Sequence, residues 1–113
     1  MYKLYGIKNC DSVKKARQWL EQENINYQFH DFRLDGLDRE LLVSFETALG
    51  WQALLNKRST SWRQLDETQK IDLSSSKAIK LMLETPTLIK RPILVTNNQF
   101  FVGFTLENYQ SLL

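Results

Sequence analysis

Cys10 is the only cysteine in this chain of 113 residues, and its sequence context is that of a reactive thiol. It follows a short apolar run, residues 3–7, and precedes Asp11 and Ser12, where a helix is expected to begin. The amino-terminal end of a helix carries unpaired N–H groups and about half a positive charge, so it stabilises a thiolate. The pattern therefore favours a nucleophilic cysteine over the alternative, a small buried core residue.

The helix end alone is too weak to stabilise the Cys10 thiolate, so nearby cations are also needed. A helix end at an exposed position contributes only about 0.3–1 kcal/mol to the stability of a nearby anion. Lys8, Lys14 and Lys15 lie close to Cys10 in the sequence and could supply positive charge. We therefore expect this segment to be a cationic site for a thiolate and its substrate.

Two arginines further along the chain are candidates for binding an anionic substrate. Arg58 lies in a polar segment, and Arg91 lies directly before Pro92 and an apolar run. Guanidinium groups bind oxyanions bidentately. Taken by itself, Arg58 is better interpreted as a solvated surface cation, whereas for Arg91 both interpretations stay open. His30 is a candidate general base, but a structural role on a strand is the favoured interpretation.

Composition narrows the class of protein. The chain is long enough for one domain, and its 42% hydrophobic content allows a core without disulfides. A single cysteine excludes an internal disulfide and fits a reducing compartment, so we expect a cytoplasmic protein. We find no signal peptide or membrane span, no metal-ligand set, and no basic stripe for nucleic acid.

The first third of the chain alternates between strand and helix patterns. We expect a strand, a helix and a strand at residues 3–7, 11 to about 24, and 27–32. Val13, Ala16 and Leu20 recur at helical spacing and form the expected buried face of the helix. A right-handed crossover makes the two strands parallel.

The middle of the chain is predicted to be helical. Asp38 caps a helix that stops at Gly50, with Leu41, Leu42 and Phe45 on one face. Further helices are expected at residues 51–55, 66–71, and from Ser74 or Ser75 to Thr85, with a polar loop at 56–61. The last of these helices is expected to turn Ala78, Ile79, Met82 and Leu83 inward.

The last third returns to strands. Residues 92–96 and 99–102 are apolar runs joined by two asparagines, which predicts a hairpin. Thr105 is expected to cap a terminal helix that contains Leu106, Tyr109 and residues 112–113.

The order of these elements predicts the fold class. It is that of an α/β protein with a thioredoxin-like fold, in which a mixed four-stranded sheet is interrupted by a helical insertion. We expect one domain over residues 1–113, with the thioredoxin-like part at about 1–33 and 86–113 and the insertion at about 37–85.

Three segments, in order, resemble the arsenate reductase (ArsC) family and, within it, the YffB-like branch. They are YGIKNCDSVKKA at residues 5–16, LLNKRSTSW at 54–62 and LIKRPI at 88–93. The resemblance covers essentially the whole chain. It implies that Cys10 is the nucleophile, that Arg58 and Arg91 bind the oxyanion, and that Pro92 opens the third strand with a cis peptide bond.

The YffB-like branch implies a glutathione-dependent thiol reductase. By that resemblance Lys8, Asn9, Lys14 and Pro92 bind glutathione, the expected co-substrate. Cys10 attacks an oxidised sulfur or an oxyanion, and an external thiol must resolve the adduct because the chain has no second cysteine. The expected partners are small molecules, and the protein is expected to be a monomer.

Two relatives within the superfamily supply alternatives. Arsenate reductases of this type carry a third arginine after the last strand, and residues 101–105 contain none. Spx-type transcription regulators bind the RNA polymerase alpha subunit and sense oxidation through a CxxC pair. Here Val13 occupies the second position of that pair, so RNA polymerase is not the expected partner.

Overall fold

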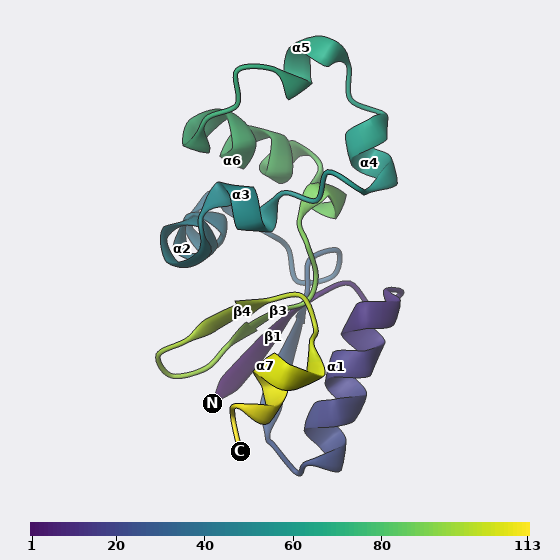
Figure 1. The fold of residues 1–113 in the computed structure, drawn as a ribbon, viewed down its shortest axis with the longest axis vertical. Coiled ribbons are helices and arrows are strands. Elements are labelled where there is room, and N and C mark those ends of the chain that lie inside the picture. The colour runs from purple at the N-terminus through teal and green to yellow at the C-terminus, as the bar shows by residue number, and fades with distance from the viewer. The chain divides into compact units, whose positions relative to one another are not determined.

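The computed structural model describes residues 1–113, and the chain divides into two compact units. Residues 1–36 and 91–113 form one of them, the sheet unit, and residues 37–90 form the other, the helical unit. Figure 1 labels the helices α2 to α6 of the helical unit and, in the sheet unit, the helices α1 and α7 and the strands β1, β3 and β4.

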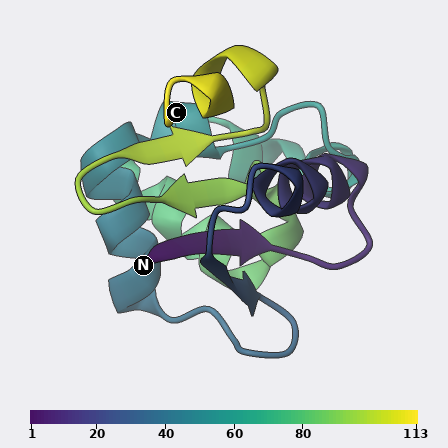
Figure 2. The ribbon, with the colours of Figure 1, turned by 90° about the horizontal axis from the view of Figure 1, so that it is seen from below.

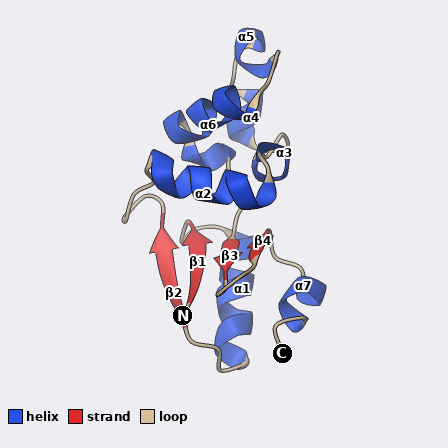
Figure 3. Cartoon of the chain, turned by 90° about the vertical axis from the view of Figure 1, so that its left-hand side faces the viewer, coloured by secondary structure: helices blue, strands red, loops and turns tan.

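The sheet unit contains a mixed four-stranded sheet in the order β2-β1-β3-β4. Its strands are β1 (Tyr2–Gly6), β2 (Tyr27–Asp31), β3 (Ile93–Val95) and β4 (Phe100–Val102). Strand β1 runs parallel to β2 and antiparallel to β3, and β4 is antiparallel to β3. Figure 2 shows purple β1 in the middle of the sheet, and Figure 3 shows the four strands side by side. The predicted thioredoxin-like fold is confirmed.

Helices α1 (Asp11–Gln22) and α7 (Leu106–Gln110) share one hydrophobic core with the sheet. Leu4 pairs with Phe29 on one side and with Leu94 on the other, so these side chains lie in one row across the sheet. The fully buried members of this core are Leu4, Ala16, Leu20, Leu94 and Tyr109. The predicted buried face of α1 is therefore confirmed.

Both helices of the sheet unit end earlier than the sequence pattern predicts. Helix α1 stops at Gln22, and Asn24 takes a left-handed conformation with φ of 56°. Helix α7 stops at Gln110, so the prediction that it includes residues 112–113 is wrong. The physical reason is a tightened last turn, in which Leu112 N donates to Tyr109 O at 3.0 Å.

The helical unit contains five short helices and one 3₁₀ turn. They are α2 (Arg39–Leu49), α3 (Trp51–Leu54), α4 (Thr60–Arg63), α5 (Glu67–Lys70), α6 (Ser75–Glu84) and η1 (Pro86–Leu88). Asp38 and Ser74 accept backbone hydrogen bonds as N-caps of α2 and α6, as their sequence context predicts.

Two local predictions in the helical unit are wrong. The predicted polar loop at 56–61 gives way to helix α4 at Thr60, because the Ser59 hydroxyl accepts a hydrogen bond from Trp62 N and caps the turn. A helix of four residues is too short to show an apolar period in the sequence. In α6, Leu81 is buried and Leu83 is only half-buried, so the inward face is rotated from the predicted one.

Candidate active site

Cys10 is the N-cap residue of α1, which is where the sequence places it. Its backbone is extended, with φ of −133° and ψ of 124°, and its carbonyl oxygen accepts the first helical hydrogen bond from Lys14 N at 2.9 Å. The side chain makes no capping hydrogen bond, and the free thiol is half-buried. The sulfur therefore lies at the positive end of a twelve-residue helix without being used to hold that helix.

A close approach between β1 and α1 fixes the start of this helix. Gly6 ends β1, and a Cβ placed on it would lie only 2.6 Å from Cγ2 of Val13 in the first turn of α1. Val13 is fully buried, and its branched side chain has one preferred rotamer in a helix, so it cannot move aside. Glycine at position 6 therefore sets how closely the Cys10 end of α1 approaches the sheet.

The loop between β1 and α1 is tied to β2 by a buried carboxylate. Asp31 ends β2 and is only 4% exposed. One of its oxygens accepts a hydrogen bond from Lys8 N at 3.2 Å, and the other accepts from Arg33 N at 2.8 Å and from Leu34 N at 3.4 Å. Burial raises the pKa of Asp31, but the three hydrogen bonds and the charge of Lys8 outweigh it and hold that pKa below its ordinary value.

Pro92 lies at the same end of the sheet as Cys10. The pairing of Leu4 with Leu94 and of Tyr5 with Ile93 brings position 92 opposite Gly6, at the point where β1 gives way to the cysteine loop. The Arg91–Pro92 peptide bond is cis, so that expectation is confirmed. Pro92 is buried, and its carbonyl oxygen accepts a hydrogen bond from Gly103 N at 2.8 Å.

The predicted site residues are divided between the two units. Six belong to one end of the sheet unit: Lys8, Asn9, Cys10, Lys14, Arg91 and Pro92. Lys8, Asn9 and Lys14 are exposed, and Arg91 is half-buried. This end of the sheet unit therefore carries the thiol and three cationic residues, Lys8, Lys14 and Arg91.

Arg58 belongs to the helical unit. It is exposed, in a turn where its N–H donates to Asn56 Oδ1 at 3.0 Å and Ser59 Oγ donates to Asn56 O at 2.8 Å. The turn is anchored by a hydrogen bond from Asn56 N to Leu88 O at 2.8 Å. Its guanidinium is thus carried on a backbone that is well ordered by local hydrogen bonds.

His30 has the surroundings of a structural residue. Its Nε2 lies 2.7 Å from the carbonyl oxygen of Gly36, within hydrogen-bond distance. The ring contacts Tyr5 and Phe32, with centroids 5.0 and 6.1 Å away. These contacts fit the favoured interpretation of His30 as a structural side chain.

Sequence reasoning did not identify Asp31 or Gly6 as contributors to the site. Asp31 is one acidic residue at the end of a predicted strand, 23 positions from the Lys8 amide that it accepts. A glycine in a short strand is a known sign of close backbone approach, so the Gly6 contact could have been anticipated. The Asp31 contact has no signal in a single sequence.

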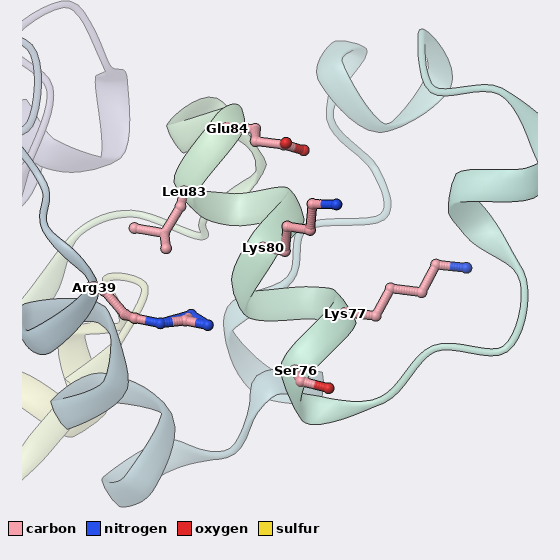
Figure 4. A pocket seen from close by; sticks show the side chains of 6 residues that line it. All are labelled: Arg39, Ser76, Lys77, Lys80, Leu83 and Glu84. Atoms are coloured by element: carbon pink, nitrogen blue, oxygen red, sulfur yellow. The ribbon is translucent and has the colours of Figure 1, made fainter.

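A surface groove, about 690 Å³ in volume, lies on the helical unit. Figure 4 shows its lining residues: Arg39, Ser76, Lys77, Lys80, Leu83 and Glu84. The ammonium of Lys77 points away from Arg39 in this view and donates to the carbonyl oxygens of Thr68 and Ile71. The Lys77 ammonium is therefore engaged by backbone carbonyl oxygens of its own unit.

The chain carries no gathered set of three or more metal-binding side chains, and none of its helices has the length and apolar character to cross a membrane.

Comparison with known proteins identifies the family. The family model of the ArsC family matches residues 5–112, and the chain belongs to that family. A Haemophilus influenzae protein is 50% identical over 111 residues, which are 98% of this chain and 97% of the relative. The solved structure of the YffB protein is 48% identical with a TM-score of 0.94, covering 98% of this chain and 97% of that one.

Regulators also occur among the relatives. The global transcriptional regulator Spx of Streptococcus mutans is 30% identical over 115 residues, which cover all of this chain and 83% of the regulator. At the second position of a CxxC pair this chain has Val13, which is fully buried in the first turn of α1. The relatives of this chain therefore include a transcriptional regulator.

Proposed function

We propose that the protein is a monothiol reductase that uses Cys10 as its nucleophile and glutathione as the external thiol. The observation that carries this proposal is the free Cys10 thiol at the N-terminus of α1, which takes no part in capping and lies at the same sheet end as Pro92. Membership of the ArsC family supports it. We place the reaction in the cytoplasm, where reduced thiols are available.

The proposed reaction balances with one cysteine in the protein. The Cys10 thiolate attacks the glutathione sulfur of a mixed disulfide, and the substrate leaves as a thiolate that takes up a proton. A disulfide between Cys10 and glutathione remains. A second glutathione thiolate attacks its glutathione sulfur, so that oxidised glutathione is released and the Cys10 thiolate is regenerated. The net reaction consumes one free glutathione thiol: the substrate thiol is released, and the two glutathione sulfurs leave joined as oxidised glutathione.

The cations have separate roles in this proposal. Arg91 and Arg58 hold negative charge on the substrate, since guanidinium groups bind carboxylates and oxyanions bidentately. Lys8, Asn9 and Lys14 contact glutathione, as the family resemblance implies. A reaction that develops a thiolate leaving group gains from fixed positive charge at the site.

The test is the reduction of a glutathionylated peptide by glutathione. We expect Cys10→Ser to lower the rate to that of the uncatalysed exchange, and mass spectrometry of the wild type to find a glutathionyl adduct on Cys10. Arg91→Gln and Arg58→Gln should each lower kcat/KM about 10- to 100-fold, the equivalent of losing a hydrogen bond to a charged group. Arg63→Gln is the matched control, because Arg63 is an exposed arginine of α4 outside the proposed site.

Retention of activity in Cys10→Ser, or equal losses in the Arg63 control, would contradict the proposal. Arsenate is the alternative substrate within the family. Residues 101–105, where arsenate reductases of this type carry a third arginine, read FVGFT. We expect turnover of arsenate to be much slower than that of a mixed disulfide, and faster arsenate turnover would reverse the order of the two candidates.

A transcription regulator is the second candidate function, favoured by the Spx relatives. It predicts saturable binding to the RNA polymerase alpha subunit at micromolar concentrations, which Cys10→Ser would leave unchanged. We expect no such binding, because the buried Val13 takes the place of the second cysteine of the CxxC sensor. A binding isotherm for the purified alpha subunit distinguishes the two functions.

A further inference from the structure

We propose that Asp31 is a positioning residue for Cys10, an inference that rests on the proposed function. Its carboxylate joins two loops at the carboxyl end of β1 and β2, the Cys10 loop through Lys8 N and the turn after β2 through Arg33 N and Leu34 N. Both oxygens are used. The hydrogen bond from Lys8 is the one that ties the turn before Cys10 to β2.

The Asp31 carboxylate makes these contacts in a buried position. Asp31 is 4% exposed, and a buried carboxylate has to be satisfied by hydrogen bonds or by a countercharge. Strand pairing fixes the position of Asp31. Asp31 is opposite Gly6 in the register of β1 and β2, and Phe32 N donates to Gly6 O at 2.9 Å. The carboxylate is thus held by the sheet, and the Cys10 loop is held by the carboxylate.

The position of this loop decides where the sulfur stands. Cys10 is two residues after Lys8, and its carbonyl already takes part in α1 through Lys14 N. Attack on a disulfide requires the thiolate to lie along the sulfur–sulfur axis of a bound substrate, and a misplacement of about 1 Å can cost about 100-fold in rate. A small reagent such as iodoacetamide approaches the thiol from solution without a bound pose. Loss of positioning should therefore slow disulfide exchange much more than alkylation.

The substitution Asp31→Asn separates the two loops in a defined way. An amide offers one acceptor oxygen and one donor nitrogen, so it cannot accept hydrogen bonds on both sides. The oxygen is expected to stay with Arg33 N and Leu34 N, where it keeps two contacts. The amide nitrogen then faces Lys8 N, and two donors oppose each other at the Cys10 loop.

Asp35→Asn is the matched control. Asp35 lies in the same turn and is exposed, and its carboxylate accepts a single hydrogen bond, from Asp31 N at 2.9 Å. An asparagine oxygen can accept that bond equally well. The control therefore makes the same chemical change without touching Lys8 N.

The experiment uses the full-length protein at a temperature where circular dichroism reports both variants as folded. We measure amide hydrogen exchange at Lys8, the rate at which Cys10 reacts stoichiometrically with oxidised glutathione, and the rate at which iodoacetamide alkylates Cys10. In Asp31→Asn we expect exchange at Lys8 to be about tenfold faster or more. The ratio of the glutathione rate to the iodoacetamide rate should fall about 10- to 100-fold. In Asp35→Asn both should stay within about twofold of the wild type.

Protection of the Lys8 amide in Asp31→Asn, an unchanged ratio, or equal effects in the Asp35 control would each overturn the proposal. If Asp31→Asn does not fold, Asp31→Glu keeps the charge but moves the carboxylate by one methylene, and the same fall in the ratio is expected. The exchange with oxidised glutathione needs only the thiol. A wild type without catalytic turnover would therefore refute the proposed reductase while this ratio still decides the role of Asp31.

Discussion

The contact between Gly6 and Val13 makes a quantitative prediction about what holds the cysteine end of α1 against the sheet. A Cβ at position 6 would stand 2.6 Å from Val13 Cγ2, well short of ordinary contact, which begins at 3.4 Å. Overpacking of this kind typically costs about 1–3 kcal/mol of unfolding free energy. We expect Gly6→Ala to destabilise the protein by that amount.

The partner substitution supplies the internal control. Val13→Ala removes two buried methyl groups, worth about 0.8 kcal/mol each, and adds a cavity term, so by itself it should cost about 2–3 kcal/mol. In the double variant the new Cβ of residue 6 occupies part of the space that Val13 leaves. The double variant should therefore be no less stable than Val13→Ala alone, with a coupling free energy of about 1–3 kcal/mol.

Urea denaturation followed by circular dichroism measures the four members of this cycle. The NMR chemical shift of the Cys10 amide adds a local readout. Displacement of the first turn of α1 in Gly6→Ala should change this chemical shift, and the added Val13→Ala substitution in the double variant should restore it. Additivity of the two costs to within about 0.5 kcal/mol would refute the reasoning. It would mean that the cost of Gly6→Ala does not come from a clash with Val13.

Three further predictions concern single groups. The lowered pKa of Asp31 means that its carboxylate binds a proton less readily in the folded state than in the unfolded chain. The stabilisation by this carboxylate is therefore present above the ordinary pKa of 3.8 and is lost as the pH falls through the lower pKa of the folded state. The stability difference between wild type and Asp31→Asn in urea titrations should be largest near neutral pH and shrink in acid. Tyr109 is fully buried, its hydroxyl has no hydrogen-bond partner, and burial raises the pKa of that hydroxyl. Tyr109→Phe should therefore leave the unfolding free energy unchanged or raise it by up to about 1 kcal/mol, and should remove part of the loss of stability above pH 10. A lower melting temperature of the variant at neutral pH would contradict this. Asp38→Ala should cost about 1 kcal/mol in thermal melts, because the Asp38 carboxylate caps α2 by accepting a hydrogen bond from Leu41 N at 2.8 Å, whereas Asp38→Asn should restore most of the stability.

Elements with a long apolar period were predictable from the sequence. Helices α1, α2 and α6 each bury one face, and residues with polar side chains begin the last two, so pattern and cap agree. Helix α4 was not predictable, since four residues with one serine cap show no period. The end of α7 was missed because its last turn tightens, which the spacing of leucines does not reveal.

The candidate site divides in the same way. Cys10 could be placed at a helix N-terminus from its neighbours in the chain, because the strand before it and the helix after it are both local patterns. For Arg58, Arg91 and Pro92 the sequence gives only candidates, and their roles are implied by the resemblance to a family, since a lone arginine or proline has many other uses.

The sequence by itself determined that this protein has one thiol, that the thiol follows a strand and opens a helix, and that any disulfide it forms must be resolved from outside. Only the tertiary structure decided that Pro92 stands opposite Gly6 and that Asp31 holds the amide of Lys8. Those contacts join residues far apart in the chain, and they follow from strand register. Register is set by the packing of whole strands against a common core, so no local stretch of sequence contains it.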